Sequence, residues 1–271
     1  MSRVRFAFSG MAAVLLLGAL SLPRLVEAVG GDPHLANESA QRNPVLVELF
    51  TSEGCSDCPP ADALLERLDR SQPVSGADLI VLSEHVDYWN DIGWKDPFSS
   101  REYSERQGAY ASEFGLSGVY TPQMIVDGRI QLVGSDEKGA IHAIENASRS
   151  AKIPVSLSSI HFDGEKIVLH LETGPSPSSI PQGFANVLLA IADERDQSNV
   201  SRGENAGRTL NHVAVLRDLV RVGALDRSGN FSQDVAISFN HGNKRNLRIV
   251  AIVQEPTAGR VLGVGSARLS N

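Results

Sequence analysis

The chain has 271 residues, a formal net charge of −7 and only two cysteines. An acidic protein does not attract nucleic acid and attracts anionic lipid only weakly, so we expect no nucleic-acid partner. Two cysteines in one motif also exclude a disulfide scaffold, in which several bridges staple a short chain. The length is enough for one large domain or two ordinary domains.

Residues 1–28 are typical of a secretory signal peptide. Arg3 and Arg5 precede an apolar run centred on residues 12–20, which falls short of the roughly 20 residues that span a bilayer. An uncleaved anchor is the alternative. Cleavage after Ala28 would change the formal charge from −7 to −9, because the segment carries three arginines and one glutamate. We expect a periplasmic or secreted protein with no membrane span after cleavage, whose polar residues 29–43 form a flexible leader.

The next stretch leads from a predicted strand into a predicted helix. Residues 45–50 are apolar and β-branched, as in a buried strand, and residues 59–70 have helical spacing. Cys55 and Cys58 lie between them at C-x-x-C spacing. Pro59 is favoured only in a first helical turn, so the helix should begin near Cys58 and leave Cys55 in the preceding turn. Because a helix N-terminus stabilises a thiolate, this pattern predicts a thiol–disulfide redox site.

The cysteine pair allows two other interpretations. A zinc site needs four ligands, but the sequence contains no second cysteine pair and no H-x-x-x-H spacing, so we expect neither a metal nor a cofactor. A purely structural disulfide stays open, although a bridge that closes so short a loop removes little entropy from the unfolded chain. Asp57 places a negative charge between the thiols, which predicts a moderate oxidant.

Four strings resemble the bacterial secreted family called domain of unknown function 1223. They are residues 47–62, 85–89, 93–98 and 120–124. The resemblance covers about residues 43–268 and implies a thioredoxin-like fold. In that fold a buried acid on the strand and a cis-proline opposite the cysteines accompany the C-x-x-C motif. By position these are Glu48 and Pro122, the latter preceded by Thr121.

The rest of the N-terminal half fits an α/β unit over residues 44–151. Residues 78–83 predict a second strand, parallel to the first through a right-handed crossover. Asp127-Gly128 is a two-residue turn signal inside a hairpin over residues 123–133. Ser135 is expected to cap a last helix that reaches about residue 150.

Residues 85–120 form an insertion that contains both tryptophans and a predicted helix over residues 100–114. Two interpretations stay open. The aromatic side chains fill the small core of a cap, or Trp89, Trp94 and Phe98 line a substrate groove over Cys55.

After Lys152 apolar and polar residues alternate in short runs, which predicts a smaller, all-β sandwich-like domain over residues 152–271. Residues 210–222 fit either a strand or a short helix. The polar segment just before them includes Glu204, Asn205 and Arg208. We expect Arg208 to pair with Glu204 or a nearby acid and to pin this loop against the redox domain; a solvated loop is the alternative.

These patterns predict an exported thiol–disulfide oxidoreductase whose partners are protein thiols or disulfides. Cys55 should form the mixed disulfide, Cys58 should resolve it, and Pro122 should shape the backbone that faces the substrate. Glu48 is expected to be buried with a raised pKa, since no cation is evident near it, and to relay the proton of Cys58. The alternative is an envelope binding module of the same fold that uses the pair as a fixed bridge or a copper site. A lone histidine such as His85 or His142 is more often structural.

Overall fold

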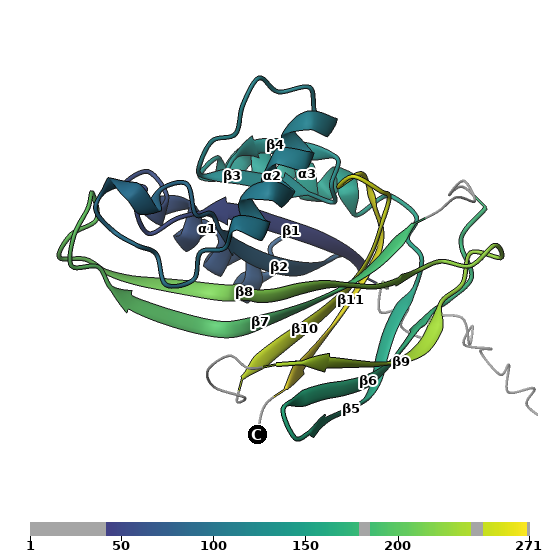
Figure 1. Ribbon diagram of the computed structural model, residues 1–271. Coiled ribbons are helices and arrows are strands. Elements are labelled where there is room, and N and C mark those ends of the chain that lie inside the picture. The colour runs from purple at the N-terminus through teal and green to yellow at the C-terminus, as the bar shows by residue number, and fades with distance from the viewer. Residues whose placement is uncertain (1–41, 179–184, 240–245, 270–271) are drawn as a thin grey trace, which may run out of the picture. The chain divides into compact units, whose positions relative to one another are not determined.

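One eight-stranded sheet runs through both halves of the chain, in the order β11-β10-β7-β8-β2-β1-β3-β4. The computed structural model describes residues 42–178, 185–239 and 246–269 (Figure 1). The expected signal peptide and most of the expected leader lie outside the described residues. All described residues belong to one compact unit.

The N-terminal half follows the predicted order of elements. They are β1 (Asn43–Thr51), α1 (Pro59–Ser71), β2 (Ala77–His85), β3 (Gln123–Val126), β4 (Ile130–Val133) and α3 (Glu137–Ala147). β1 pairs in parallel with β2 and antiparallel with β3, and β3 and β4 form the predicted hairpin. The expected cap of α3 is wrong by one residue, because the carboxylate of Asp136 accepts the N–H of Gly139 at 3.0 Å.

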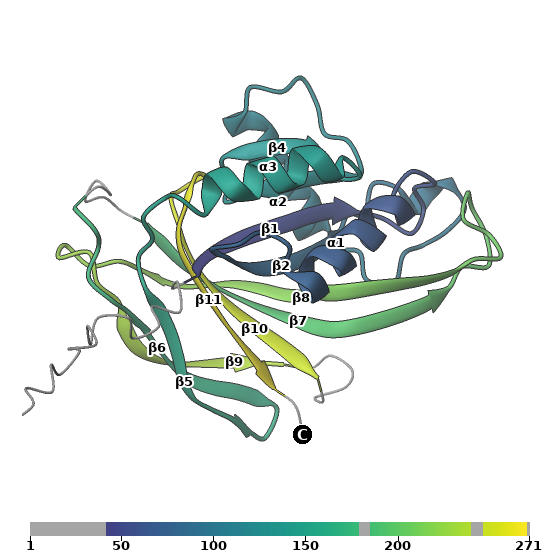
Figure 2. The same ribbon diagram turned by 180° about the vertical axis from the view of Figure 1, so that it is seen from behind.

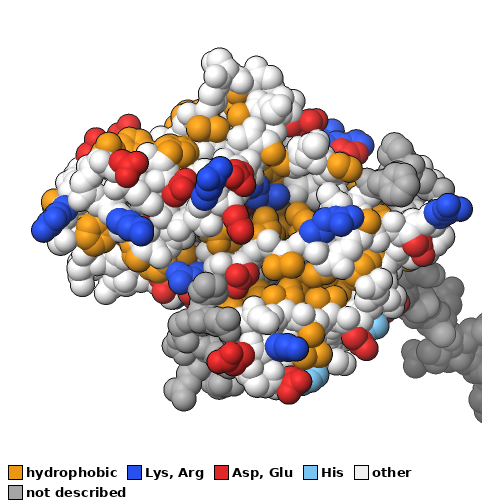
Figure 3. Space-filling model, in the orientation of Figure 1, with side chains coloured by type: hydrophobic (Ala, Val, Ile, Leu, Met, Phe, Trp, Pro, Cys, Tyr) orange, Lys and Arg blue, Asp and Glu red, His pale blue; other side chains and the backbone are white. Residues whose placement is uncertain are grey.

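The insertion between β2 and β3 holds η1 (Asn90–Ile92) and α2 (Arg101–Glu113). Ser100 caps α2 by accepting the N–H of Glu102 at 3.2 Å, so the predicted helix over residues 100–114 is confirmed. α2 lies on one side of β1, and α1 and α3 lie on the other side (Figures 1 and 2). Hydrophobic side chains gather in the middle of the face shown in Figure 3.

The C-terminal half consists of strands. They are β5 (Val155–Asp163), β6 (Lys166–Thr173), β7 (Asn186–Asn199), β8 (Thr209–Ala224), β9 (Ser232–Ser238), β10 (Leu247–Gln254) and β11 (Val261–Leu269). Only β5, β6 and β9 form a separate three-stranded sheet, which shares a hydrophobic core with β7 and β10. β8 pairs with β2, so four strands of the expected second domain extend the sheet of the first. The structure therefore differs from the expected division between residues 151 and 152.

Alternation along β1 decides which side chains face the cysteines. Val47 and Leu49 pack against the apolar side chains of α1, such as Leu64 and Leu65. Residues 46, 48 and 50 point to the opposite side, because successive side chains of a strand face opposite ways. Phe50 accordingly packs with Tyr110 of α2, with ring centroids 6.0 Å apart.

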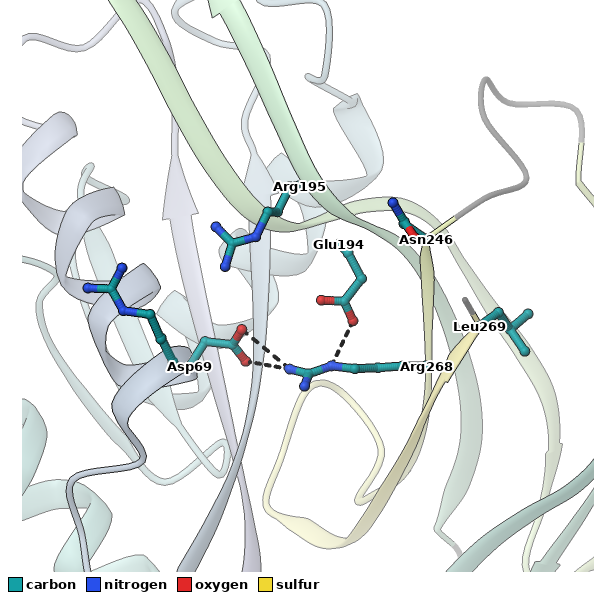
Figure 4. A pocket seen from close by; sticks show the side chains of 7 residues that line it. Asp69, Glu194, Arg195, Asn246, Arg268 and Leu269 are labelled. Atoms are coloured by element: carbon teal, nitrogen blue, oxygen red, sulfur yellow. Dashed lines mark hydrogen bonds and ion pairs between the residues drawn. The ribbon is translucent and has the colours of Figure 1, made fainter. Parts of the chain in front are cut away.

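A buried arginine joins the two halves. Arg248 of β10 is 2% exposed and forms ion pairs with Asp69 of α1 and Glu194 of β7. The exposed Arg268 of β11 reaches the same two carboxylates from the wall of a pocket of about 470 Å³ (Figure 4). α1 is thus tied to the strands of the C-terminal half through charged side chains.

Candidate functional site

The cysteine pair lies at the start of α1. Cys55 and Cys58 form a disulfide with their Cα atoms 5.4 Å apart. Cys58 is the N-cap of α1, and its carbonyl accepts the N–H groups of Ala61 (2.8 Å) and Asp62 (3.1 Å). The N–H of Cys58 donates to the carbonyl of Cys55 at 3.3 Å. The helix therefore begins where Pro59 predicted, with Cys55 in the turn before it.

Both cysteines are enclosed. Cys55 is 1% exposed and Cys58 is fully buried, so neither cysteine is open to solvent. Two segments distant in sequence lie against the turn. Trp89 of the insertion packs on Gly54, where an added Cβ would lie 3.2 Å from the Trp89 Cβ. The loop between β7 and β8 also hydrogen-bonds to the backbone of the turn.

This loop, residues 200–208, is called the strap below. Asn205 is buried, and its side-chain amide donates to the carbonyls of Glu53 and Cys55, both at 2.9 Å. A carboxylate oxygen of Glu204 accepts the N–H of Ser56 at 3.0 Å. The expected pairing of Arg208 with an acid is wrong, because its guanidinium donates to the Asn205 side-chain oxygen at 2.9 Å. The strap nevertheless lies against the N-terminal half, as expected, and the structure places this contact at the cysteine turn.

A cluster of buried histidines and carboxylates adjoins the pair. It consists of Glu53, Asp62, His85, Asp96 and His212, and is called the histidine–carboxylate cluster below. His212 Nε2 lies 3.2 Å from a carboxylate oxygen of Glu53, and His212 Nδ1 lies 3.9 Å from one of Asp62. His85 Nδ1 contacts Asp96 at 2.7 Å, and the two histidine rings lie 4.7 Å apart. The sequence reasoning considered only His85, and as a single structural residue.

Burial and neighbouring charges perturb this cluster. Burial raises the pKa of Asp62 above its ordinary 3.8, and one of its carboxylate oxygens has no hydrogen-bond partner in the described part of the chain. Burial by itself would lower the pKa of His85, but the carboxylates of Asp96, Asp62 and Glu53 together outweigh it and the pKa is raised above 6.5. Burial would likewise raise the pKa of Asp96, but His85 holds it below 3.8. Asp62 follows Cys58 by four residues on α1, a spacing that puts two helical side chains on one face.

Glu48 is buried as expected, but on the wrong side of β1 for its expected role. Its carboxylate accepts hydrogen bonds from the Arg106 guanidinium (2.8 Å to Nε) and from the Tyr110 hydroxyl (2.5 Å), both on α2. The premise that Glu48 has no cation nearby is therefore wrong. Because α1 lies on the opposite side of the strand, the geometry gives no support to a proton relay between Glu48 and Cys58.

The Thr121–Pro122 peptide is cis, as expected. A Cβ added to Gly134 would lie 3.0 Å from the Pro122 Cβ and 3.1 Å from the Ala61 Cβ, so Pro122 lies beside the first turn of α1. The Thr121 hydroxyl accepts the indole N–H of Trp89 at 2.8 Å. The structure thus brings this segment next to the cysteine helix.

The three aromatic residues of the expected groove all have partners at the site. Besides the Trp89 contact, the indole N–H of Trp94 donates to Glu53 at 2.7 Å. The ring of Phe98 lies 5.4 Å from that of His85 and 5.8 Å from that of His212. These contacts favour the interpretation in which the aromatic residues fill a cap. A groove for substrate stays a prediction.

A pocket of about 460 Å³ reaches the cluster through His212, which lines it together with Glu66 and Asp196. Burial, aided by nearby Asp193, raises the pKa of Asp196 to about 6. Within residues 42–178, 185–239 and 246–269, no group of three or more His, Cys, Asp or Glu side chains is arranged to hold a metal. In the same ranges, no helix is long and apolar enough to cross a membrane.

Comparisons with known proteins agree with the resemblance seen in the sequence. The model of the family described as "Protein of unknown function (DUF1223)" matches residues 46–254. The crystal structure of protein AGR_C_4864 from Agrobacterium tumefaciens is 28% identical, with a TM-score of 0.64, and the match covers 85% of this chain and 96% of that one. HBP35 of Porphyromonas gingivalis shares the fold at 16% identity, with a TM-score of 0.61 and coverage of 84% and 76%. No curated protein matches this chain.

Proposed function

The chain belongs to the DUF1223 family, and we propose that it is an exported thiol–disulfide oxidoreductase with a thioredoxin-like fold. One observation carries the proposal: the Cys55–Cys58 disulfide lies at the first turn of α1, one turn from the buried Asp62. Opening the disulfide creates thiolates, which a helix N-terminus stabilises. Asp62, whose pKa is raised by burial, is suited to exchange a proton with the sulfur.

The exchange reaction assigns separate roles to the two sulfurs. A thiolate of the substrate attacks Sγ of Cys55, the Cys55–Cys58 bond breaks, and its electron pair leaves on Cys58, which takes a proton from Asp62. A second substrate thiolate then attacks the substrate sulfur of the mixed disulfide, and Cys55 leaves as a thiolate. The substrate dithiol is oxidised and the cysteine pair is reduced by two electrons. In the reverse direction Asp62 accepts the proton of Cys58.

The remaining parts of the proposal rest on the sequence. Export rests on the pattern of residues 1–28, and the partners are protein thiols or disulfides. The proposal needs no cofactor, because the cysteine pair itself carries the electrons. Thr121 and Pro122, next to the first turn of α1, offer backbone to a bound substrate.

One observation favours a second candidate. Both cysteines are almost completely buried, as in a fixed structural bridge, which would suit an envelope binding module. The described residues contain no group of three or more His, Cys, Asp or Glu side chains that could bind copper. The reversible chemistry of the pair separates the two candidates.

A redox titration of the purified protein, read by mass after alkylation, tests the proposal. Structural disulfides have potentials below roughly −300 mV, so a higher value supports the oxidoreductase and a lower one supports the fixed bridge. Cys58→Ser should trap mixed disulfides with protein substrates, whereas Cys55→Ser should not. Equal trapping by the two variants would contradict the assigned roles.

The role of Asp62 has a matched control in the same protein. Asp62→Asn should slow exchange and change its pH profile, because the amide cannot accept the proton of Cys58. Glu48→Gln removes another buried carboxylate, on the other side of β1, and should leave that profile unchanged. A change of profile in the Glu48 variant alone would return the relay to Glu48.

A further inference from the structure

The strap is joined to the cysteine turn by few interactions. Only Val200 and Asn205 of the strap are buried, and its other residues are exposed. It lies beyond the last strand pair, Asn199 with Thr209, at the tip of the β7–β8 hairpin. Local opening is easiest where few apolar contacts are buried and backbone groups are exposed. The strap is therefore a segment that can open without unfolding the sheet.

The strap also has an internal structure that lets it move as one piece. The N–H of Val200 donates to the carbonyl of Arg208 at 3.0 Å, and the N–H of Gly207 donates back to Val200 at 2.8 Å. Gly203 and Gly207 have positive φ angles of 76° and 82°, which glycine adopts without strain. These bonds do not involve the cysteine turn, so they persist when the strap leaves it.

The hydrogen bonds that would break on opening fall on the backbone around Cys55, and Gly203 would also leave its close packing against Gly93 and Trp94 of the insertion. Asn205 binds the carbonyls of Glu53 and Cys55, and Glu204 binds the N–H of Ser56. These bonds hold the backbone just before and just after Cys55, which is only 1% exposed. A thiolate must reach Sγ of Cys55 in order to attack it, so the closed arrangement obstructs the reaction.

We propose that the strap is a gate on the Cys55–Cys58 disulfide, held closed by Asn205 and Glu204, and that its local opening must precede attack on Cys55. The idea that the gate controls thiol–disulfide exchange with a substrate rests on the proposed function. The opening of the strap does not depend on that function. A protein substrate needs the open state in order to bind, because in the closed state Asn205 and Glu204 already occupy the backbone groups around Cys55.

The first experiment measures reduction of the oxidised protein by dithiothreitol. One thiolate of the reagent attacks Sγ of Cys55, Cys58 leaves with the electron pair and is protonated, and the second thiol displaces Cys55 to close the oxidised ring of the reagent. Asn205→Ala should raise the rate by roughly tenfold, which corresponds to about 1.4 kcal/mol in the opening equilibrium. Glu204→Ala, at an exposed position, should raise the rate in the same direction without a risk to folding.

Asn230→Ala is the matched control, because Asn230 is a hydrogen-bonded loop asparagine that follows β8, at the other end of that strand from the strap. Its rate should equal that of the unaltered protein. If Asn205→Ala and Glu204→Ala are reduced no faster than Asn230→Ala, the gate does not exist.

The second measurement is amide hydrogen exchange at Ser56 by NMR in the oxidised protein. Asn205→Ala should accelerate this exchange by the same factor as the reduction, since both pass through the same opening. Faster exchange with an unchanged reduction rate would overturn the gate. If reduction and Ser56 exchange are both faster but the potential of the pair lies below roughly −300 mV, the strap covers a structural disulfide. In that case the gate exists and only the proposed function fails.

Discussion

Replacement of Arg248 tests whether charged side chains join α1 to the C-terminal strands. The guanidinium makes two hydrogen bonds to Asp69 (2.9 and 3.0 Å), two to Glu194 (3.0 and 2.8 Å) and one to the carbonyl of Val81 (3.3 Å). Arg248→Met keeps much of the volume but leaves two carboxylates, 8% and 19% exposed, without their main cation.

Breaking a buried ion pair by removing one partner costs roughly 3–5 kcal/mol, because the surviving charge stays desolvated. We expect the free energy of unfolding to fall by about 4 kcal/mol in Arg248→Met. For a protein of this size that corresponds to a melting temperature lower by roughly 8–16 °C. Urea unfolding of the oxidised protein, followed by circular dichroism, measures the loss.

Arg268 supplies the control, because it binds the same carboxylates at 3.3 Å (Asp69) and 2.9 Å (Glu194) but is 61% exposed. Figure 4 shows its guanidinium directed toward both of them. Arg268→Met should cost less than about 1 kcal/mol, as exposed ion pairs do. Adding Asp69→Asn and Glu194→Gln to Arg248→Met should recover part of the loss, since no desolvated carboxylate is then left without its main cation and the exposed Arg268 stays solvated. Equal losses from the two arginine variants would refute the reasoning.

Three further outcomes are expected. The raised pKa of His85 means that its contribution to stability is complete below pH 6.5 and is lost as the pH rises through the folded-state pKa. Asp96→Asn removes the carboxylate that contributes most to raising this pKa and should flatten the decline in urea unfolding, whereas the exposed Asp234→Asn should not. Gly134→Ala should cost roughly 1–3 kcal/mol, since its Cβ would lie 2.7 Å from a Leu49 methyl carbon, whereas Gly118→Ala, with open space around it, should cost much less in the same assay. Lys152→Met should lower the free energy of unfolding by roughly 3 kcal/mol at neutral pH, because Lys152 Nζ lies 2.6 Å from the buried Asp127 carboxylate. Equal melting temperatures of this variant and of Lys138→Met, at an exposed position, would contradict this prediction.

The local features of the cysteine site were predictable from the sequence. Pro59 after Cys58 marks the start of α1, and the helix begins there because proline is tolerated only in the first turn. Asp127-Gly128 marks the hairpin, and both residues have positive φ angles in the structure. Such signals act within a few residues of the chain, so no knowledge of distant contacts is needed to interpret them.

The surroundings of the disulfide were decided by the tertiary structure. Period-two alternation shows that Glu48 and its neighbours face opposite sides of β1, but not which side carries α1, and this is why Glu48 was assigned to the wrong face. The pairing of β8 with β2 brings His212 to Glu53 and Asp62, and the hairpin tip brings Asn205 to Cys55, across about 150 residues of chain. The pattern of apolar residues along a strand indicates which side chains are buried. It does not indicate which other strand pairs with that strand, because the backbone hydrogen bonds between strands are the same for every neighbour. The sequence by itself therefore determined the cysteine pair and its helix, and only the packing of the second half against the first decided which residues surround it.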